Sequence, residues 1–155
     1  MLFRSLRERR DQPFFLAVGF FRPHTPYVSP RKYFDLYPKD RLTLVPDPTA
    51  DRAGKPAVAL SNTTVANYGM TEDTQRTAKQ AYLASTSFMD AQFGLVLAEL
   101  RRQGLDQNTI VIFLSDHGYN LGEHGLWQKR SLYEDSARVP FVIRDRKSTR
   151  LNSSH

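Results

Sequence analysis

Two stretches of the chain, residues 14–20 and 109–114, are apolar at almost every position and lack polar alternation. Such short continuous runs are typical of strands that are buried on both faces of a mostly parallel sheet. A third run, at 139–143, has the same character. The pattern therefore predicts three buried strands, with the strands near 14–20 and 109–114 as neighbours or near-neighbours in one sheet.

A long amphipathic helix is predicted between the first two runs. Thr71 is placed to open it, Glu72 and Asp73 follow in its first turn, and Gly104 supplies its stop. Strand, long helix and strand fit a right-handed crossover unit, so the predicted fold class is α/β, a mostly parallel sheet flanked by helices. The core-facing stripe of the helix recurs at steps of three and four residues. It consists of Ala78, Ala81, Tyr82, Ser85, Phe88, Met89, Phe93, Val96, Leu97 and Leu100.

Composition and charge exclude several classes of protein. The chain of 155 residues has a net charge of +6 and no cysteine, which excludes a disulfide framework and a thiolate metal site. Four arginines and one glutamate in residues 1–10 give +3, and four cations and one aspartate in residues 144–155 give another +3, so residues 11–143 are neutral overall. Because the basic excess sits at the two ends, no nucleic-acid partner is expected. No apolar run reaches the length of a membrane span, and no targeting segment is found.

Polar side chains that are candidates for binding or catalysis follow two of the predicted strands. Asp116 and His117 come directly after the run at 109–114, Gly118 lets the chain turn, and Lys129 follows about a dozen residues later. His24 lies in a proline-rich loop just after the run at 14–20. Ligands of open α/β sheets bind beyond the carboxyl ends of the strands, where a carboxylate and an imidazole can both face a metal ion. Taken alone, the first motif is better explained as a polar turn after a strand, and the second as a surface loop with an incidental histidine.

The longer strings around these residues resemble a known family. Residues 115–129 are similar to the metal-binding and active-site segment of the sulfatase family, within the alkaline-phosphatase-like superfamily. Residues 13–26 resemble the strand and loop of the same family whose histidine contacts the sulfate ester. The segments 131–134 and 138–140 match the iduronate-2-sulfatase-like branch. Two motifs in the family's order carry this resemblance, which covers roughly residues 13–143.

The resemblance implies roles for individual residues. It implies that Asp116 and His117 supply part of a Ca²⁺ site, and that His24 and Lys129 are the catalytic and substrate-binding residues. Lys129 would contact the sulfate and His24 would lie near the scissile oxygen, where it could act as a general acid. These four side chains are therefore expected to converge at one end of the sheet. Trp127 could face a sugar ring or pack in the core, whereas loop hydrogen bonding is favoured for Glu123 and His124.

The chain also departs from the family pattern. It contains no Cys/Ser-x-Pro-x-Arg segment, from which the family's formylglycine nucleophile is made, and it lacks the family's paired upstream aspartates. Both are expected before residue 1. Residues 1–144 are therefore predicted to be a partial sulfatase catalytic domain that is inactive alone, and residues 145–155 a non-native, disordered tail. The Ca²⁺ site would be incomplete.

Other functions fit the same residues. A phosphonate or phosphate ester hydrolase of the same superfamily could use the Asp-His pair and a lysine, since these groups serve any tetrahedral anion. A non-catalytic module that binds anions through its basic ends is the alternative from another class. For the sulfatase hypothesis, the family implies a sulfated small molecule or glycan as substrate and a periplasmic, exported or lysosomal location. The sequence leaves the particular ester, the compartment and the oligomeric state open.

Overall fold

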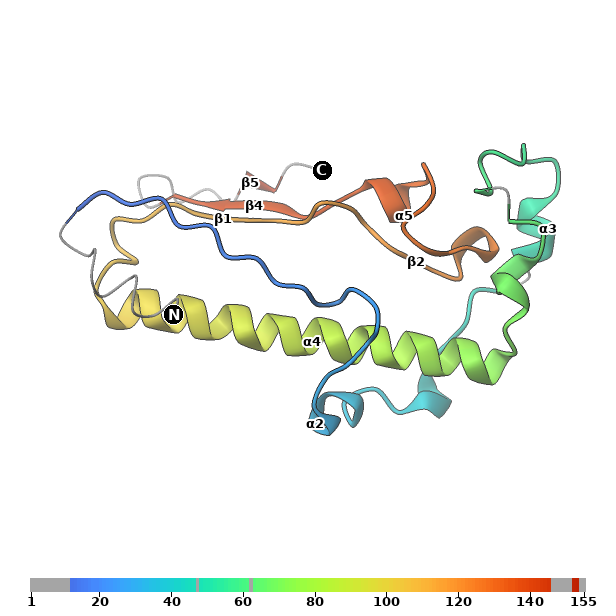
Figure 1. The fold of residues 1–155 in the computed structure, drawn as a ribbon, viewed down its shortest axis with the longest axis horizontal. Coiled ribbons are helices and arrows are strands. Elements are labelled where there is room, and N and C mark those ends of the chain that lie inside the picture. Colours follow the sequence, from blue (N-terminus) through green and yellow to red (C-terminus); the bar gives the residue numbers. More distant parts are fainter. Residues whose placement is uncertain (1–11, 47, 62, 146–151, 154–155) are drawn as a thin grey trace.

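A single long helix, α4 (Glu72–Arg102), is the scaffold of the fold in the computed structural model, which describes residues 12–46, 48–61, 63–145 and 152–153. The Thr71 hydroxyl accepts the Thr74 amide hydrogen at 3.2 Å and caps the first turn. The helix ends at Arg102, and Gly104 just beyond it has a φ of +70°, which reverses the chain direction. The sequence prediction of this helix and of both its ends is confirmed. Figure 1 shows α4 running along most of the molecule, with the sheet on one side and α2 on the other.

The sheet is antiparallel among the described residues. Strand β1 (Val111–Leu114) pairs with β4 (Phe141–Arg144), and β4 also pairs with β5 (Asn152–Ser153). A second ladder joins β2 (Asn120–Leu121) to β3 (Trp127–Gln128). The predicted parallel arrangement is wrong for these strands. Parallel neighbours need a long crossover, usually a helix, whereas the connection from β1 to β4 contains only short elements, such as the four-residue helix α5 (Glu134–Ala137).

The apolar run at 14–20 belongs to neither ladder, so the prediction that it is a strand of one sheet with 109–114, as a neighbour or near-neighbour, is wrong. Phe15 is 95% exposed, which also contradicts burial on both faces. The end of this run is held by aromatic contacts. Phe20 packs edge-on against Phe93 of α4 at 6.4 Å, and Phe93 packs against Phe113 of β1 at 5.0 Å. These contacts place the segment near the sheet without backbone pairing.

Strand β1 is covered on one face only. Val111 and Phe113 are half-buried, whereas Ile112 and Leu114 are exposed. An apolar run cannot by itself show whether one face or both faces will be covered, because that depends on which elements pack nearby. The prediction that 109–114 contains a strand is confirmed, and its burial on both faces is wrong in the described structure.

Short helices lie along the side of α4 that faces away from the sheet and at one end of α4. They are α2 (Arg31–Phe34), η1 (Lys39–Arg41), α3 (Pro48–Arg52) and η2 (Ala66–Gly69). Tyr33 stacks obliquely on Phe88 at 5.4 Å, and the Tyr37 hydroxyl bonds to Ser87 Oγ at 2.6 Å, so α2 and the turn after it are anchored on α4. The segment at 38–70, between α2 and α4, thus contains several helical turns.

Deeply buried side chains lie on α4, at Ala84 and Ser85, and around β2, η3 (Glu123–Gly125) and β3. Leu126 and Trp127 are 2% and 4% exposed, and the Trp127 indole donates a hydrogen bond to Asn67 Oδ1 at 2.9 Å. A ring held in this way cannot stack on a sugar, so core packing is the correct alternative for Trp127.

No helix among the described residues is long and apolar enough to cross a membrane. Most of the predicted tail at 145–155 lies outside the described residues. Asp145 follows β4 directly, and residues 152–153 form β5.

Candidate active site

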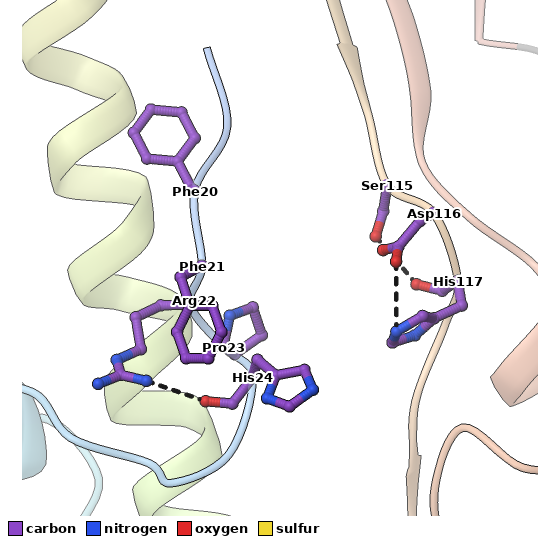
Figure 2. Close-up of a pocket in the computed structure, with 8 residues that line it drawn as sticks. All are labelled: Phe20, Phe21, Arg22, Pro23, His24, Ser115, Asp116 and His117. Carbon is purple, nitrogen blue, oxygen red and sulfur yellow. Dashed lines mark hydrogen bonds and ion pairs between the residues drawn. The ribbon is translucent and has the colours of Figure 1, made fainter.

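A small pocket of about 250 Å³ lies between two segments that are far apart in the sequence. One wall is the loop at 20–24 and the other is the segment at 115–117, which follows β1. Figure 2 shows the rings of His24 and His117 directed toward the gap from opposite sides. The pocket thus brings together three of the four predicted site residues: His24, Asp116 and His117.

The loop that carries His24 is fixed by local hydrogen bonds. The His24 amide donates to Phe21 O at 3.0 Å. Arg22 donates from Nε to Val28 O at 2.9 Å and from Nη1 to His24 O at 3.1 Å, so it joins the start of the loop to its end. Its guanidinium group points away from the gap in Figure 2, toward the backbone that it holds. Arg22 therefore shapes the loop and leaves the space between the two walls open.

The protonation pattern of the His24 ring follows from its neighbour. Nδ1 lies 2.7 Å from Thr25 O, and because a carbonyl oxygen can only accept, Nδ1 must carry the hydrogen. Nε2 is then a lone-pair atom in the neutral ring and a donor in the protonated ring. Nε2 is therefore the ring atom of His24 that can exchange a proton with a ligand, because Nδ1 is hydrogen-bonded to the backbone.

The opposite wall presents two potential ligand atoms. His117 Nδ1 donates to Gly118 O at 2.7 Å, which leaves the Nε2 lone pair free for a metal ion. Asp116 Oδ2 lies 3.6 Å from this Nε2, and its side chain is 84% exposed. The Ser115 hydroxyl donates to His117 O at 2.9 Å and steadies the turn. Carboxylate and imidazole atoms so placed can reach the same cation.

Asp116 Oδ2 and His117 Nε2 are suited to serve as two of the ligands of a divalent cation. Backbone fixation of the unused histidine nitrogen is the usual way in which a metal-binding tautomer is selected. However, Ca²⁺ takes six to eight oxygen ligands, and no cluster of three or more His, Asp or Glu side chains is placed to hold a metal within the described part of the chain. Asp116 and His117 therefore account for part of a coordination sphere.

Gly118 holds the Asp116–His117 segment close to α5. A Cβ at this position would overlap the backbone oxygen of Asp135 and lie 2.7 Å from that of Arg138. The Gly118 amide donates to Ser136 O at 2.8 Å. The glycine is thus required for the close approach of two backbones, which differs from the turn that the sequence predicted.

Lys129 is placed differently from the other predicted residues. It follows β3, it is half-buried, and it does not line the pocket. Its side chain makes no hydrogen bond or ion pair with another described residue, although its carbonyl accepts the Ser136 hydroxyl at 2.5 Å. Ser136 thereby ties the backbone of Lys129 to the amide of Gly118. A direct contact between Lys129 and sulfate stays a prediction.

The other polar residues of the motif serve the loop, as predicted. The Leu121 amide donates to Glu123 Oε2 at 2.5 Å, and His124 Nδ1 lies 2.5 Å from Asp51 Oδ2. The His124 ring also stacks on Tyr133 at 3.8 Å. Both side chains therefore connect parts of the scaffold.

Sequence reasoning missed several residues around the pocket. Phe21, Arg22 and Ser115 line it, although none was singled out. Tyr27 and Tyr119, each a few residues beyond a predicted site residue, join their hydroxyl groups. Adjacency to the two motifs was the available signal, but the sequence does not indicate which neighbours point into the pocket.

Comparisons with known proteins agree with these observations. The family described as Sulfatase matches residues 2–154. The chain is 40% identical over 144 residues to iduronate 2-sulfatase from Mus musculus, covering 84% of this chain and 26% of that protein. It is 36% identical over 149 residues to choline-sulfatase from Rhizobium meliloti (strain 1021), covering 92% of this chain and 29% of that protein. The chain thus spans between a quarter and a third of these relatives.

Among solved structures, the phosphonate monoester hydrolase of Agrobacterium radiobacter superposes with a TM-score of 0.81 at 26% identity. The match covers 94% of this chain and 31% of that one. The likeness identifies the architecture as part of an α/β domain of the alkaline-phosphatase-like type. It also supports the resemblance on which the site residues were predicted.

Proposed function

Because the chain belongs to the sulfatase family, we propose that it carries part of the active site of a sulfuric ester hydrolase. The observation that supports this most strongly is the pocket in which His24 faces the Asp116–His117 pair. One wall offers a proton-exchanging nitrogen and the other offers ligands for a cation. Besides a nucleophile, these are the kinds of group that favour cleavage of an anionic ester.

The ester's negative charge repels nucleophiles, so positive charge is needed near its oxygens. Asp116 and His117 would hold a Ca²⁺ ion together with ligands from elsewhere in the whole protein. A cation bound there would polarise the sulfuryl oxygens and favour attack at sulfur. The exposed Asp116 carboxylate and the fixed tautomer of His117 support this assignment.

His24 is proposed as the general acid. Its Nδ1 hydrogen is committed to Thr25 O, so a protonated ring can give up only the Nε2 hydrogen toward the pocket. That proton would pass to the bridging oxygen as the bond from this oxygen to sulfur breaks, and the alcohol would leave neutral. The hydrogen bonds from Arg22 and to Phe21 O keep the ring at the edge of the gap.

The nucleophile and the contact to sulfate from Lys129 complete the proposal. We expect the nucleophile to be a formylglycine in a part of the whole protein that this sequence does not include. Lys129 would approach the sulfate from the β3 side, held in place through the Ser136 hydroxyl.

Sulfated sugars or small sulfated alcohols are the proposed substrates. The relatives are named for an iduronate sulfate and for choline sulfate, which differ in size and charge. A phosphonate monoester is the second candidate, since the superposed hydrolase is named for one. The higher identity to sulfatases, 40% against 26%, favours the sulfate ester.

The test compares two substrates on the whole protein. Aryl sulfate and aryl phosphonate monoester are assayed with the unmodified enzyme, with Asp116→Asn, and with Asp40→Asn as a control. Asp40 is an exposed aspartate of η1 that does not line the pocket. We expect a higher kcat/KM for the sulfate, a loss of about 100-fold or more in Asp116→Asn, and no change in Asp40→Asn.

A higher kcat/KM for the phosphonate than for the sulfate would refute the proposed sulfate ester and favour a phosphonate monoester as the substrate. Equal activity of Asp116→Asn and the unmodified enzyme would refute the metal role of Asp116.

A further inference from the structure

The two walls of the pocket lack a direct backbone connection. Among the described residues, no backbone hydrogen bond joins residues 12–30 to residues 105–145. The separation of His24 from Asp116 and His117 must therefore depend on side chains and on their common support, α4.

Two aromatic bridges connect the walls. In the sequence, the residues of the first come before His24 and Asp116, and those of the second come after His24 and His117, apart from their partners on α4. The first is Phe20–Phe93–Phe113, with ring distances of 6.4 and 5.0 Å. The second is the tyrosine cluster of Tyr27, Tyr82 and Tyr119, one from each wall and one from α4. Tyr82 stacks on Tyr119 at 4.6 Å and meets Tyr27 edge-on at 6.0 Å.

The tyrosine cluster contains the polar link between the walls. The hydroxyl groups of Tyr27 and Tyr119 are hydrogen-bonded to each other across 92 positions of sequence. Tyr27 lies three residues after His24, and Tyr119 lies two residues after His117. A tyrosine hydroxyl can donate or accept, so the pair needs one hydroxyl in each role and no other partner. An aromatic packing role alone would not require either hydroxyl group.

We propose that Tyr27 and Tyr119 are positioning residues that fix the separation of His24 from the Asp116–His117 pair, with Tyr82 as their support on α4. This inference rests on the proposed function for its catalytic meaning. Its structural content, the coupling of the two walls through one hydroxyl pair, is independent of that function. Loss of either hydroxyl should loosen both walls, because among the described residues the two walls are then held to each other only by apolar contacts.

The test uses Tyr→Phe variants, which keep the rings and remove the hydroxyl groups. Tyr27→Phe, Tyr119→Phe and the double variant are compared with Tyr37→Phe. Tyr37 is a matched control because its hydroxyl bonds to Ser87 Oγ of α4 at 2.6 Å, away from the pocket. Amide hydrogen exchange is followed at His24 and Gly118, whose amides are bonded to Phe21 O and Ser136 O.

We expect each single variant to speed exchange at both reporter amides by about three- to tenfold, as one hydrogen bond implies. The double variant should be no faster than either single one, since both remove the same bond. Tyr37→Phe should leave both reporters unchanged. In the whole protein, kcat for sulfate ester hydrolysis should fall in Tyr27→Phe and in Tyr119→Phe, and stay constant in Tyr37→Phe.

Exchange that speeds up only in the mutated wall, or in neither wall, would overturn the proposed coupling. Coupled exchange in a protein that hydrolyses no sulfate ester would uphold the link and refute the proposed function. Coupled exchange with kcat unchanged in an active enzyme would refute the positioning role.

Discussion

Substituting Gly118 by alanine is expected to destabilise the fold beside the candidate active site. The added Cβ would overlap Asp135 O and lie 2.7 Å from Arg138 O, and both obstacles are backbone atoms that cannot rotate away. Overpacking of this kind costs about 1–3 kcal/mol. Displacement of the Gly118 amide from Ser136 O adds about 0.5–1.5 kcal/mol. The free energy of unfolding should therefore fall by about 1.5–4.5 kcal/mol, the sum of these two contributions.

The assay is thermal unfolding followed by circular dichroism. For a chain of this size the expected loss corresponds to a Tm lower by about 3–18 °C. Gly94→Ala is the matched control, because Gly94 lies on α4 and a Cβ there meets nothing within 4 Å. Alanine is the better helix former, so this variant should be more stable by about 0.5–1 kcal/mol. If Gly118→Ala melted at or above the temperature of the unmodified chain, the inferred close approach to α5 would be refuted.

Three further predictions concern the surrounding scaffold and the isolated chain. Ser136→Ala should lower the free energy of unfolding by about 1 kcal/mol, because the Lys129 carbonyl loses its donor; an unchanged midpoint in urea would contradict this. Hydrogen bonds from Lys55 and then His124 hold the pKa of Asp51 below its ordinary 3.8, so the stability they provide is present above that pH and is lost as pH falls through the lower folded-state pKa. Urea midpoints measured against pH should therefore fall less steeply below about pH 4 in Asp51→Asn than in the unmodified chain, and parallel curves would refute this linkage. The chain of 155 residues should show no turnover of an aryl sulfate and weak Ca²⁺ binding at most; turnover above that of a heat-denatured sample would contradict it.

Helix α4 could be predicted from the sequence because its determinants are local. The hydroxyl cap at Thr71, the acidic first turn and the reversal at Gly104 all lie within a few residues of the ends that they define. The same holds for the placement of His24 and Asp116 directly after apolar runs. Local chemistry was sufficient wherever a segment's conformation depends on its own neighbours.

Strand pairing could not be predicted in the same way. The runs at 14–20 and 109–114 look alike in the sequence, yet only the second forms a ladder, and its partner β4 is antiparallel. Pairing direction depends on which distant segment approaches, and apolar content does not encode it. The Tyr27–Tyr119 link was missed for the same reason, since it requires the three-dimensional path of both walls around α4.

The role of His24 is tested most directly by the dependence of hydrolysis on the leaving group. In the whole protein, kcat/KM of His24→Ala is compared with that of the unmodified enzyme for a nitrophenyl sulfate and for an alkyl or sugar sulfate. A nitrophenolate departs without a proton, whereas an alkoxide needs one. A general acid contributes about 100- to 10,000-fold, so the account predicts a loss of this size for the alkyl or sugar ester and a much smaller loss for the nitrophenyl ester. Equal losses for both esters would contradict proton donation by His24.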